Sequence, residues 1–509
     1  MQESAAHRGK KIAQNTLMLY VRMFALMLVG LYTSRVVLAA LGESDFGIYN
    51  VVGGVVSMFT IISGALNSAV SRFITFEMGK GEKARLDKVY STAVTIQFII
   101  ALIVVILAEP IGLWFIDNKM TIDPTRIQAA RYVLHFSLLA FVINLMSVPQ
   151  MASITAHEKM SAYAYIGILD GLLRLGVAFL IMRSSSDRLV IYSALMAFVV
   201  LIIRTAYGIY CRTHFPECRY RPVFDRRLIT EMFSFAGWNF IGVAAGVFRD
   251  HGGNIIVNLF SGPVVNAARG IAVQLNGTVQ GFVTNFMTAV NPQITKSYAS
   301  GEKEYMLSLV RKSSRMSYYL LLVIALPVLF NTDYLISLWL KEIPDHTISF
   351  VRLFLIFALS ESLSNPLITA AQATGKIRNY QIVVGGLILL NLPVSYLFLR
   401  AGARPEVTVI VAIVISQICL FARLLMLRKM IGLDVGKFIH RVYLNVISVT
   451  FIAVLVPFMA LRYISSGFVG FLICVMISIL SASLSILFVG CSVKERNEMV
   501  GMIKKKFRG

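Results

Sequence analysis

The chain has 509 residues, of which 57% are apolar and only 15% are charged, and its mean hydropathy is +0.74. Soluble globular domains are less apolar and more highly charged, so this composition excludes an ordinary soluble protein and indicates a chain that lies in lipid. The net charge of +22 would suggest a nucleic-acid partner if the basic residues formed a stripe on a soluble face. They are instead grouped in short segments between apolar runs, and we therefore expect no nucleic-acid partner.

Two further features narrow the class of protein. The basic segment at residues 7–11 precedes an apolar stretch that is too long for a signal peptide and has no small-residue cleavage site, so we expect the first span to be retained. The cysteines have no metal-like spacing and are interpreted as packing thiols, and neither a metal ion nor a cofactor is expected. They are Cys211, Cys218, Cys419, Cys474 and Cys491.

Taken in chain order, fourteen apolar runs are long enough to cross a bilayer as helices, because the hydrocarbon core needs about 20 helical residues. The sequence therefore predicts an all-α membrane protein with about 14 transmembrane helices. Very short turns separate two pairs of spans, at residues 42–45 and 261–263. The predicted spans are 14–40, 46–71, 90–116, 130–154, 161–182, 189–211, 232–260, 264–290, 316–340, 349–373, 380–399, 406–427, 442–463 and 468–490.

Lys and Arg fall mainly in alternate connecting segments, such as residues 72–88, 212–227 and 296–315. The positive-inside rule places such basic segments in the cytoplasm. Because the number of predicted spans is even, both termini are expected on the cytoplasmic side.

The second group of six spans repeats the first. The residues Gly81, Glu82 and Lys83 recur as Gly301, Glu302 and Lys303, and the other matches are residues 69–70 with 289–290, 74–75 with 294–295, Gly42 with Gly262, Trp114 with Trp339, Ser147 with Ser364, Pro149 with Pro366, and Lys159 with Lys376. Since six is even, the two halves enter the membrane from the same side. A parallel repeat of this kind is one way in which transporters build alternating access around a central cavity.

The repeat defines the predicted domains. They are an N-terminal six-helix lobe at 1–212, a cytoplasmic linker at 213–231, a C-terminal six-helix lobe at 232–428, an additional helix pair at 429–491 and a basic cytoplasmic tail at 492–509.

Four short motifs carry a resemblance to a known family. They are residues 41–49 at the exit of the first span, residues 71–73 at the end of the second, residues 262–270 and residues 291–294. On these motifs the chain resembles the polysaccharide, or lipid-linked oligosaccharide, flippases of the multidrug, oligosaccharidyl-lipid and polysaccharide exporter (MOP) superfamily. The resemblance implies two six-helix lobes forming a V around a central cavity, with two additional C-terminal helices. It also implies a multi-pass protein of the bacterial cytoplasmic membrane whose partners are a lipid-linked oligosaccharide diphosphate, membrane lipids and the polysaccharide polymerase machinery.

Charge inside the spans bears on the substrate. An arginine at a helix centre costs about 2.5–3.5 kcal/mol on insertion scales, so each calls for a partner, water or a function. Acidic residues in the spans are fewer, and an interior rich in guanidinium groups favours a diphosphate over a cationic drug. The intramembrane arginines singled out are Arg22, Arg35, Arg174, Arg204, Arg249, Arg269 and Arg352.

The resemblance places the first, second, seventh and eighth spans around the cavity. It therefore implies that Arg35, Arg249 and Arg269, with Arg22 next, bind the substrate. The alternative is that Arg35, Arg249 and Arg269 reach headgroups from near the ends of their spans. Arg204 and Arg352 are interpreted as structural.

Two carboxylates are candidates for ion coupling. Asp170 and Arg174 are spaced i, i+4, so they share a helix face and can form a local ion pair, or Asp170 can be a protonatable coupling site. Glu361 is likewise a candidate for a protonatable coupling site. Residues 249–254 interrupt an apolar span with polar residues and glycines. They indicate either a gate or headgroup site that includes Asn254, or a simple kink or interfacial break. Asn67 faces either the sugar or a neighbouring helix.

The function expected is a flippase that moves an undecaprenyl-diphosphate-linked repeat unit of O-antigen, capsule or exopolysaccharide from the inner to the outer leaflet by alternating access. Two alternatives stay open: a cation-coupled multidrug exporter of the same superfamily, and a membrane-embedded sugar polymerase or ligase. The enzyme alternative is the weaker one, because no nucleotide-binding motif or metal-ligand cluster interrupts the spans.

Overall fold

The computed structural model describes residues 2–120, 122–184, 186–340, 342–460, 467–493 and 495–497. Within these residues every regular element is helical and no strand is present, which confirms the all-α prediction. The chain divides into two compact units: unit 1 comprises Met1–Val243 and Thr288–Gly301, and unit 2 comprises Ala244–Met287 and Glu302–Gly509. The first boundary between the units follows Val243, whereas the predicted N-terminal lobe ends at residue 212 and the predicted C-terminal lobe begins at residue 232. Most of the predicted tail, residue 494 and residues 498–509, lies outside the described residues, as do residues 461–463 of a predicted span.

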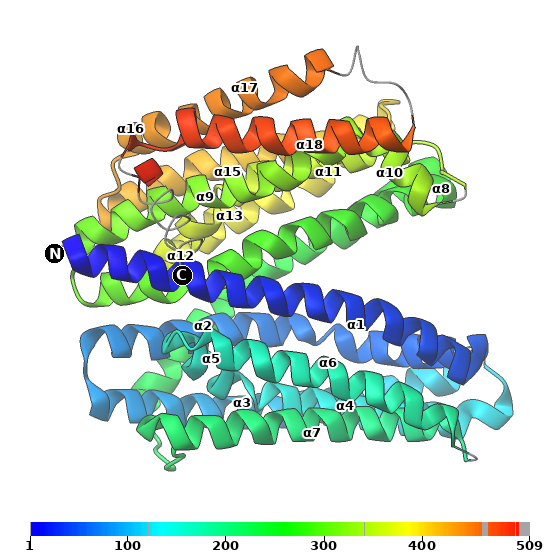
Figure 1. Ribbon diagram of the computed structural model, residues 1–509. Helices are drawn as coiled ribbons and strands as arrows, with labels where there is room; N and C mark the ends of the chain where they lie inside the picture. The colour runs from blue at the N-terminus through cyan, green and yellow to red at the C-terminus, as the bar shows by residue number, and fades with distance from the viewer. Residues whose placement is uncertain are drawn as a thin grey trace, which may run out of the picture. The chain divides into compact units, whose positions relative to one another are not determined.

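Unit 1 is a bundle of long helices that run side by side (Figure 1). Within it α1 packs against α6, α4 against α7, and α2 against α5. Its elements are α1 (Gln2–Ser57), α2 (Thr60–Lys80), α3 (Lys83–Asn118), η1 (Pro124–Arg126), α4 (Ile127–Leu145), α5 (Val148–Ala156), α6 (Met160–Met182), α7 (Arg188–His214), η2 (Pro216–Cys218) and the first and last parts of α8 (Arg226–Ala299).

Unit 2 contains the middle of α8 and the remaining helices. Here α11, α13 and α14 pack against α15, and α9 packs against α11 and α18. The elements are α9 (Lys303–Phe330), α10 (Thr332–Trp339), α11 (Thr347–Ser362), α12 (Asn365–Ala373), α13 (Arg378–Leu389), α14 (Asn391–Arg400), α15 (Val407–Ile431), α16 (Val435–Phe438), η3 (Ile439–Tyr443), α17 (Leu444–Ala460), α18 (Phe468–Ser485) and η4 (Ile486–Gly490).

Twelve helical stretches among the described residues are long and apolar enough to cross a membrane. Two of them are too long for one crossing: α8 has 74 residues and α1 has 56, against about 20 for the bilayer core. Each is kinked at a glycine, α8 at Gly262 and α1 at Gly42. The kink in α8 separates two spans, and the part of α1 after Gly42 continues into α2 as another, so the chain has about fourteen spans as predicted.

The kinks lie at equivalent positions of the repeat. Gly42 has φ 78° and ψ 168°, and Gly262 has φ 79° and ψ 178°. This region of backbone space is essentially restricted to glycine. The turns after the second and eighth spans also match, because Gly81 and Gly301 both have φ 78°. The two halves therefore share backbone features as well as sequence.

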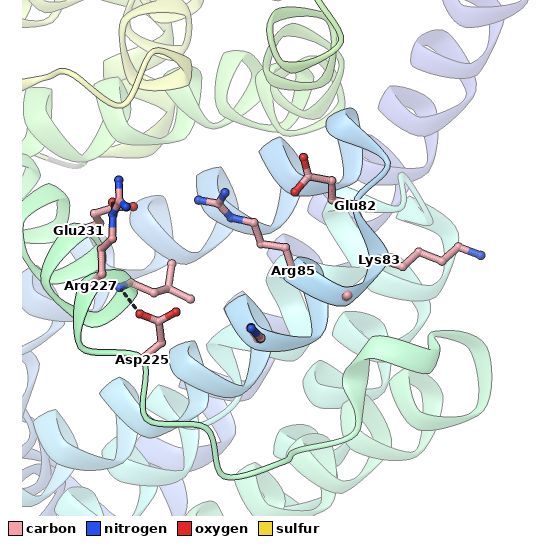
Figure 2. A pocket seen from close by; sticks show the side chains of 9 residues that line it. Glu82, Lys83, Arg85, Asp225, Arg227 and Glu231 are labelled. Atoms are coloured by element: carbon pink, nitrogen blue, oxygen red, sulfur yellow. Dashed lines mark hydrogen bonds and ion pairs between the residues drawn. The ribbon is translucent and has the colours of Figure 1, made fainter.

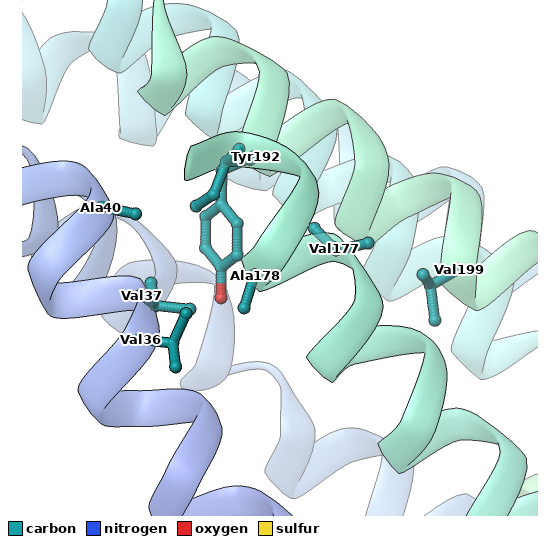
Figure 3. Packing of buried hydrophobic residues seen from close by; sticks show 8 residues of the cluster. Val36, Val37, Ala40, Val177, Ala178, Tyr192 and Val199 are labelled. Carbon is teal, nitrogen blue, oxygen red and sulfur yellow. The ribbon is translucent and has the colours of Figure 1, made fainter. Parts of the chain in front are cut away.

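A cluster of small and β-branched side chains forms part of the core of unit 1 (Figure 3). Tyr192 of α7 points between α1 and α6, where Val37 and Ala178 are almost fully buried. Its ring meets Tyr49 edge-on, with centroids 4.8 Å apart. Side chains of this size allow α1, α6 and α7 to pack closely, which fixes the segment on either side of the Gly42 kink.

Ionic contacts and a hydrogen bond also hold the segment around this kink. Arg126 Nε donates to Asp45 Oδ1 at 3.0 Å and Arg126 Nη1 donates to Asp187 Oδ2 at 2.7 Å. Arg188 Nη1 donates to the carbonyl oxygen of Ala40 at 3.0 Å. A carbonyl next to a kink has lost its helical partner, and this bond satisfies it.

The additional helix pair, α17 and α18, is attached to α9 by polar contacts. Tyr318 and Thr450 share a hydrogen bond of 2.8 Å, and Arg315 Nη1 donates to the carbonyl oxygen of Gly490 at 2.9 Å. Arg315 Nη2 also donates to Glu495 at 2.8 Å. These contacts fix the pair at one end of unit 2, while large apolar side chains such as Phe451 remain exposed, as expected for a helix that faces lipid.

Replacing a kink glycine tests this account. A β-carbon at Gly262 meets no atom within 4 Å, so Gly262→Ala introduces only backbone strain. We expect it to lower the free energy of unfolding by about 1–3 kcal/mol, the usual cost of a non-glycine residue in this region. The measurement is thermal unfolding in detergent. The control is Gly277→Ala, at a helical glycine with equally open surroundings, which is expected to be neutral or stabilising. Equal stability of the two variants would contradict the assignment.

Candidate functional site

Four of the predicted site residues, Arg249, Asn254, Arg269 and Glu361, come together in unit 2. With Asp250 they form a cluster that we call the arginine cluster. Arg249 Nε donates to Asp250 Oδ1 at 2.9 Å, and Arg249 Nη1 donates to Glu361 Oε1 at 3.4 Å. The Arg249 side chain is 14% exposed and that of Glu361 is 26% exposed, whereas Asp250 is half exposed. The Arg249 side chain therefore points into the interior of unit 2 and is paired with two carboxylates.

Arg269 lies deeper, at 4% exposure. Its Nη1 donates to the side-chain oxygen of Asn254 and, at 3.2 Å, to the backbone carbonyl of Asp250. Its Nε is buried and has no hydrogen-bond partner among the described residues. A buried guanidinium with an unused N–H can donate a hydrogen bond to a further anionic or carbonyl oxygen.

Phenylalanines of α11 cover the two guanidinium groups. The Cζ atom of Arg249 is 4.7 Å from the ring centroid of Phe357, and that of Arg269 is 5.4 Å from the ring centroid of Phe354. Aromatic faces attract cations and exclude water from one side of the group. The polar edge of each guanidinium is thereby directed to the carboxylates, Asn254 and the Asp250 carbonyl.

The glycines of this segment have a packing role. Of the two alternatives for residues 249–254, the kink or interfacial break is not observed, since α8 is helical throughout this segment, and the gate or headgroup site stays a prediction. A β-carbon at Gly253 would lie 2.4 Å from Arg269 Nη2, and one at Gly252 would lie 2.7 Å from a terminal methyl of Leu392. The missing side chains leave room for Arg269 and α14, which is why glycine occurs there without a change of backbone conformation.

Arg423 of α15 is a site residue that the charge analysis did not single out. It is 4% exposed, its Nε donates to the Tyr380 hydroxyl at 3.1 Å and its Nη1 donates to Ser364 Oγ at 3.0 Å. Glu361 is close enough to interact with it electrostatically. The sequence signal was present, because the residue lies inside the predicted span 406–427.

With Arg423 included, the interior of unit 2 holds three buried guanidiniums against the carboxylates of Asp250 and Glu361. A further polar chain continues from the residue before Glu361. Ser360 bonds to Ser416 and accepts from Gln417, whose side-chain oxygen accepts from Tyr443 Oη at 3.0 Å. Polar groups therefore extend from the arginine cluster to η3, the π-helix that precedes α17.

The other predicted site residues lie in unit 1. Arg22 of α1 lies over the ring of Tyr163 in α6, with Cζ 4.4 Å from the centroid, and against Gly167. Asp170 and Arg174 form the expected i, i+4 pair, at 2.9 Å. Both features are consistent with charges that stabilise the packing of α6.

Arg35 and Asn67 are exposed, and neither makes a hydrogen bond or ion pair with the described residues. Arg352, interpreted as structural, pairs with Asp333 at 2.6 Å near an exposed helix end. Arg204 has a buried Nη1 without a partner in the described part of the chain. The binding roles of Arg35 and Asn67 and the structural role of Arg204 stay predictions. All five cysteines are buried and free, as expected for packing thiols.

A separate pocket of about 590 Å³ lies in unit 1, where α3 and α8 begin (Figure 2). Side chains of both signs line it. Arg227 Nε donates to Glu231 Oε1 at 3.2 Å, and Asp225 caps α8 by accepting from the backbone N–H of Leu228. None of the predicted site residues lines this pocket, and its mixed charge gives no preference for an anion.

The sequence matches two protein family models and a membrane protein of an archaeon. The family model described as "Polysaccharide biosynthesis protein" matches residues 12–298, and the MatE family model matches residues 252–397. An uncharacterised membrane protein of Methanocaldococcus jannaschii is 24% identical over 362 residues, which cover 64% of this chain and 68% of that protein.

Solved structures share the fold. An outward-facing multidrug resistance MATE family transporter of the MOP superfamily superposes with a TM-score of 0.72 at 13% identity and covers 84% of this chain and 96% of its own. A MOP superfamily transporter from Pyrococcus furiosus, described as having a binding pocket of reversed polarity, gives 0.70 at 11% identity with 83% and 96% coverage. A mutant MATE transporter of Vibrio cholerae gives 0.70 at 15% identity with 84% and 98% coverage. Identities this low establish the fold alone.

Charge balance in the arginine cluster is testable by substitution. Arg249→Met leaves Asp250 and Glu361 without their cation, and we expect it to lower the free energy of unfolding by about 3 kcal/mol, the low end for breaking a buried pair because Asp250 is half exposed. Adding Asp250→Asn and Glu361→Gln should recover most of this loss. Arg352→Met, which breaks an exposed pair, should cost less than about 1 kcal/mol. Thermal unfolding in detergent measures all three, and no recovery in the triple variant would contradict the proposed pairing.

Proposed function

Because the chain belongs to the polysaccharide biosynthesis protein family and is a transporter of the MOP superfamily, we propose that it flips a lipid-linked oligosaccharide diphosphate across the membrane. The cargo class is an undecaprenyl-diphosphate-linked repeat unit of O-antigen, capsule or exopolysaccharide. The membrane is the bacterial cytoplasmic membrane, with both termini in the cytoplasm as the basic segments suggest. The polysaccharide polymerase machinery receives the flipped product.

One observation carries the choice of an anionic cargo. Arg269 is buried, is held in place by Asn254 and the Asp250 carbonyl, and keeps an unused donor. A guanidinium binds phosphate oxygens through charge-assisted hydrogen bonds, which strengthen where water is excluded. A cationic drug has no favourable interaction with such a group.

The carboxylates of the cluster suggest how binding is coupled to an ion. Arg249 is bound to Asp250 and Glu361, so a diphosphate that binds Arg249 competes with them for the same N–H groups. Protonation of a carboxylate releases Arg249 for the phosphate, and return of the phosphate to the bilayer surface restores the ion pair. Proton uptake thus accompanies cargo binding, with Arg269 and Arg423 as the other charges that face Glu361 and Asp250.

A second candidate function is cation-coupled multidrug export. The MatE model matches α8 from residue 252 onward and all of α11, and Glu361 is an acidic group in that stretch. This reading requires the carboxylates, rather than the arginines, to contact the substrate.

The arginine requirement is tested by transport. Proteoliposomes that contain undecaprenyl-diphosphate-linked sugar are assayed for its movement between leaflets. We expect Arg269→Ala to slow translocation roughly tenfold or more, because a hydrogen bond to a charged group contributes about 1.5–3 kcal/mol. Arg269→Lys keeps the charge but not the planar donor set and should be intermediate. Arg352→Ala is the matched control, from an exposed ion pair in the same unit, and should leave the rate unchanged.

Unchanged translocation by Arg269→Ala would overturn the proposed role of this residue. Energised cells that export ethidium when they produce the chain, with no movement of the lipid-linked sugar, would support the multidrug alternative instead.

Ion coupling is tested by Glu361→Gln, which removes a charge that competes for Arg249. We expect translocation by this variant to lose its response to an imposed pH gradient while binding of the lipid-linked sugar is retained. The readout is the translocation rate with and without the gradient. Asp333→Asn, which alters the exposed partner of Arg352, serves as control. An undiminished response in Glu361→Gln would exclude this carboxylate as the coupling group.

A further inference from the structure

The turn between α5 and α6 holds a buried carboxylate that the proposed function does not use. Glu158 is 5% exposed and has φ 59°, a conformation uncommon for a residue with a side chain. In the repeat its counterpart is Gly375, with φ 75°, which adopts this backbone without strain. A strained residue persists where its surroundings determine it strongly, so the contacts of the Glu158 side chain need an explanation.

Those contacts join three separate segments of unit 1. Glu158 Oε1 accepts from Lys296 Nζ at 2.9 Å, and Oε2 accepts from Gln293 Nε2 at 2.8 Å and pairs with Lys11 Nζ at 2.9 Å. The backbone carbonyl of Glu158 accepts from Asn15 Nδ2 at 3.2 Å. One residue thereby connects the start of α1, the α5–α6 turn and the end of α8.

The electrostatic balance keeps this carboxylate charged. Burial alone raises the pKa of Glu158, but the charge of Lys296 and the hydrogen bonds from Lys296 and Lys11 outweigh it, so the pKa lies below its usual range. Lys296 is 25% exposed and Lys11 44% exposed, so water reaches both ammonium groups. A pair that water can reach is broken and reformed more easily than a fully buried one.

The segment that Glu158 holds has a special place in the chain. Residues Thr288–Gly301 belong to unit 1, although the part of α8 that directly precedes them, Ala244–Met287, belongs to unit 2. The segment is closely packed in unit 1: Ser297 is 2% exposed, and a β-carbon at Gly79 of α2 would lie 2.7 Å from the Ala299 β-carbon. Because α8 is continuous, a rearrangement of unit 2 acts directly on this segment.

The contacts are absent from the other half of the repeat. The counterparts of Gln293 and Lys296 are Phe73 and Phe76, which cannot bind a carboxylate, and the counterpart of Glu158 has no side chain. The duplicated fold therefore does not require these polar residues. Their occurrence at only one of the two equivalent places in the repeat indicates a function specific to the end of α8.

We propose that Glu158, with Lys11, Gln293 and Lys296, is a releasable ionic latch that docks the end of α8 onto unit 1, and that the transport cycle opens and closes it. The latch rests on the proposed function only in requiring a cycle of conformations, and it makes no assumption about the cargo. When it opens, the ammonium groups are solvated and the face of α8 that carries Ser297 is uncovered.

Thiol accessibility tests the latch without any transport substrate. Ser297→Cys places a nearly isosteric thiol in the buried face, in a chain whose own cysteines are all buried. We expect Glu158→Gln to speed maleimide labelling of this thiol about tenfold in membranes, because two charge-assisted hydrogen bonds are weakened. Lys296→Met should have a smaller effect, and Lys11→Met the smallest because Lys11 is the more exposed cation.

The matched control is Glu495→Gln in unit 2. Glu495 is also a buried carboxylate bound by two cations, Arg315 at 2.8 Å and Lys312 at 3.7 Å. Both of these cations are in α9, and neither is in α8. It should leave labelling of the Ser297→Cys thiol unchanged. Thermal unfolding in detergent shows whether Glu158→Gln has lost its fold. If it has, the labelling rate of Lys296→Met is compared with that of the parent instead. Equal labelling in Glu158→Gln, Lys296→Met and the parent would overturn the latch, whatever the cargo proves to be.

Discussion

The cost of placing guanidinium groups inside a membrane protein organises unit 2. Arg249, Arg269 and Arg423 are each removed from water, and each is stabilised differently: the first by two carboxylates, the second by an amide and a backbone carbonyl, and the third by two hydroxyl groups. Acceptors for these groups come from α8, α11, the turn that precedes α12, and α13, so the packing of these elements depends on them. In a low-dielectric interior such an arrangement is stable only when nearly every donor is satisfied. The buried donor of Arg269 that lacks a partner among the described residues is therefore the feature that indicates a ligand.

The carboxylates of the arginine cluster change how an arginine-lined site is expected to bind an anion. An interior with arginines alone would bind an anion strongly and release it slowly, whereas carboxylates next to Arg249 provide an internal competitor for the anion. Exchange between an internal and an external partner is a physical basis for coupling, because each state satisfies the guanidinium and neither leaves it bare.

The duplication appears in the backbone more than in the side chains. Gly42 and Gly262 place the same kink in both halves, because only glycine adopts that backbone geometry without strain. By contrast, Glu158 has no chemical counterpart at Gly375. A parallel repeat needs matched kinks and turns to form similar helical units, but its surfaces and buried polar groups are free to differ. The arginine cluster in unit 2 and the Glu158 latch in unit 1 are products of that freedom.

By itself the sequence determined the features that depend on local composition and periodicity. These are the multi-pass membrane character, the approximate number of spans, the close succession of spans at Gly42 and Gly262 and the i, i+4 pair of Asp170 and Arg174, because each follows from residues near one another in the chain. Only the tertiary structure decided which charges share a site. Arg249 and Glu361 are far apart in sequence, and whether an intramembrane arginine meets a carboxylate or a headgroup depends on the rotation of one helix against another. Hydropathy is insensitive to that rotation, so Arg423 was missed, and the packing role of the glycines beside Asn254 could not be told from a kink.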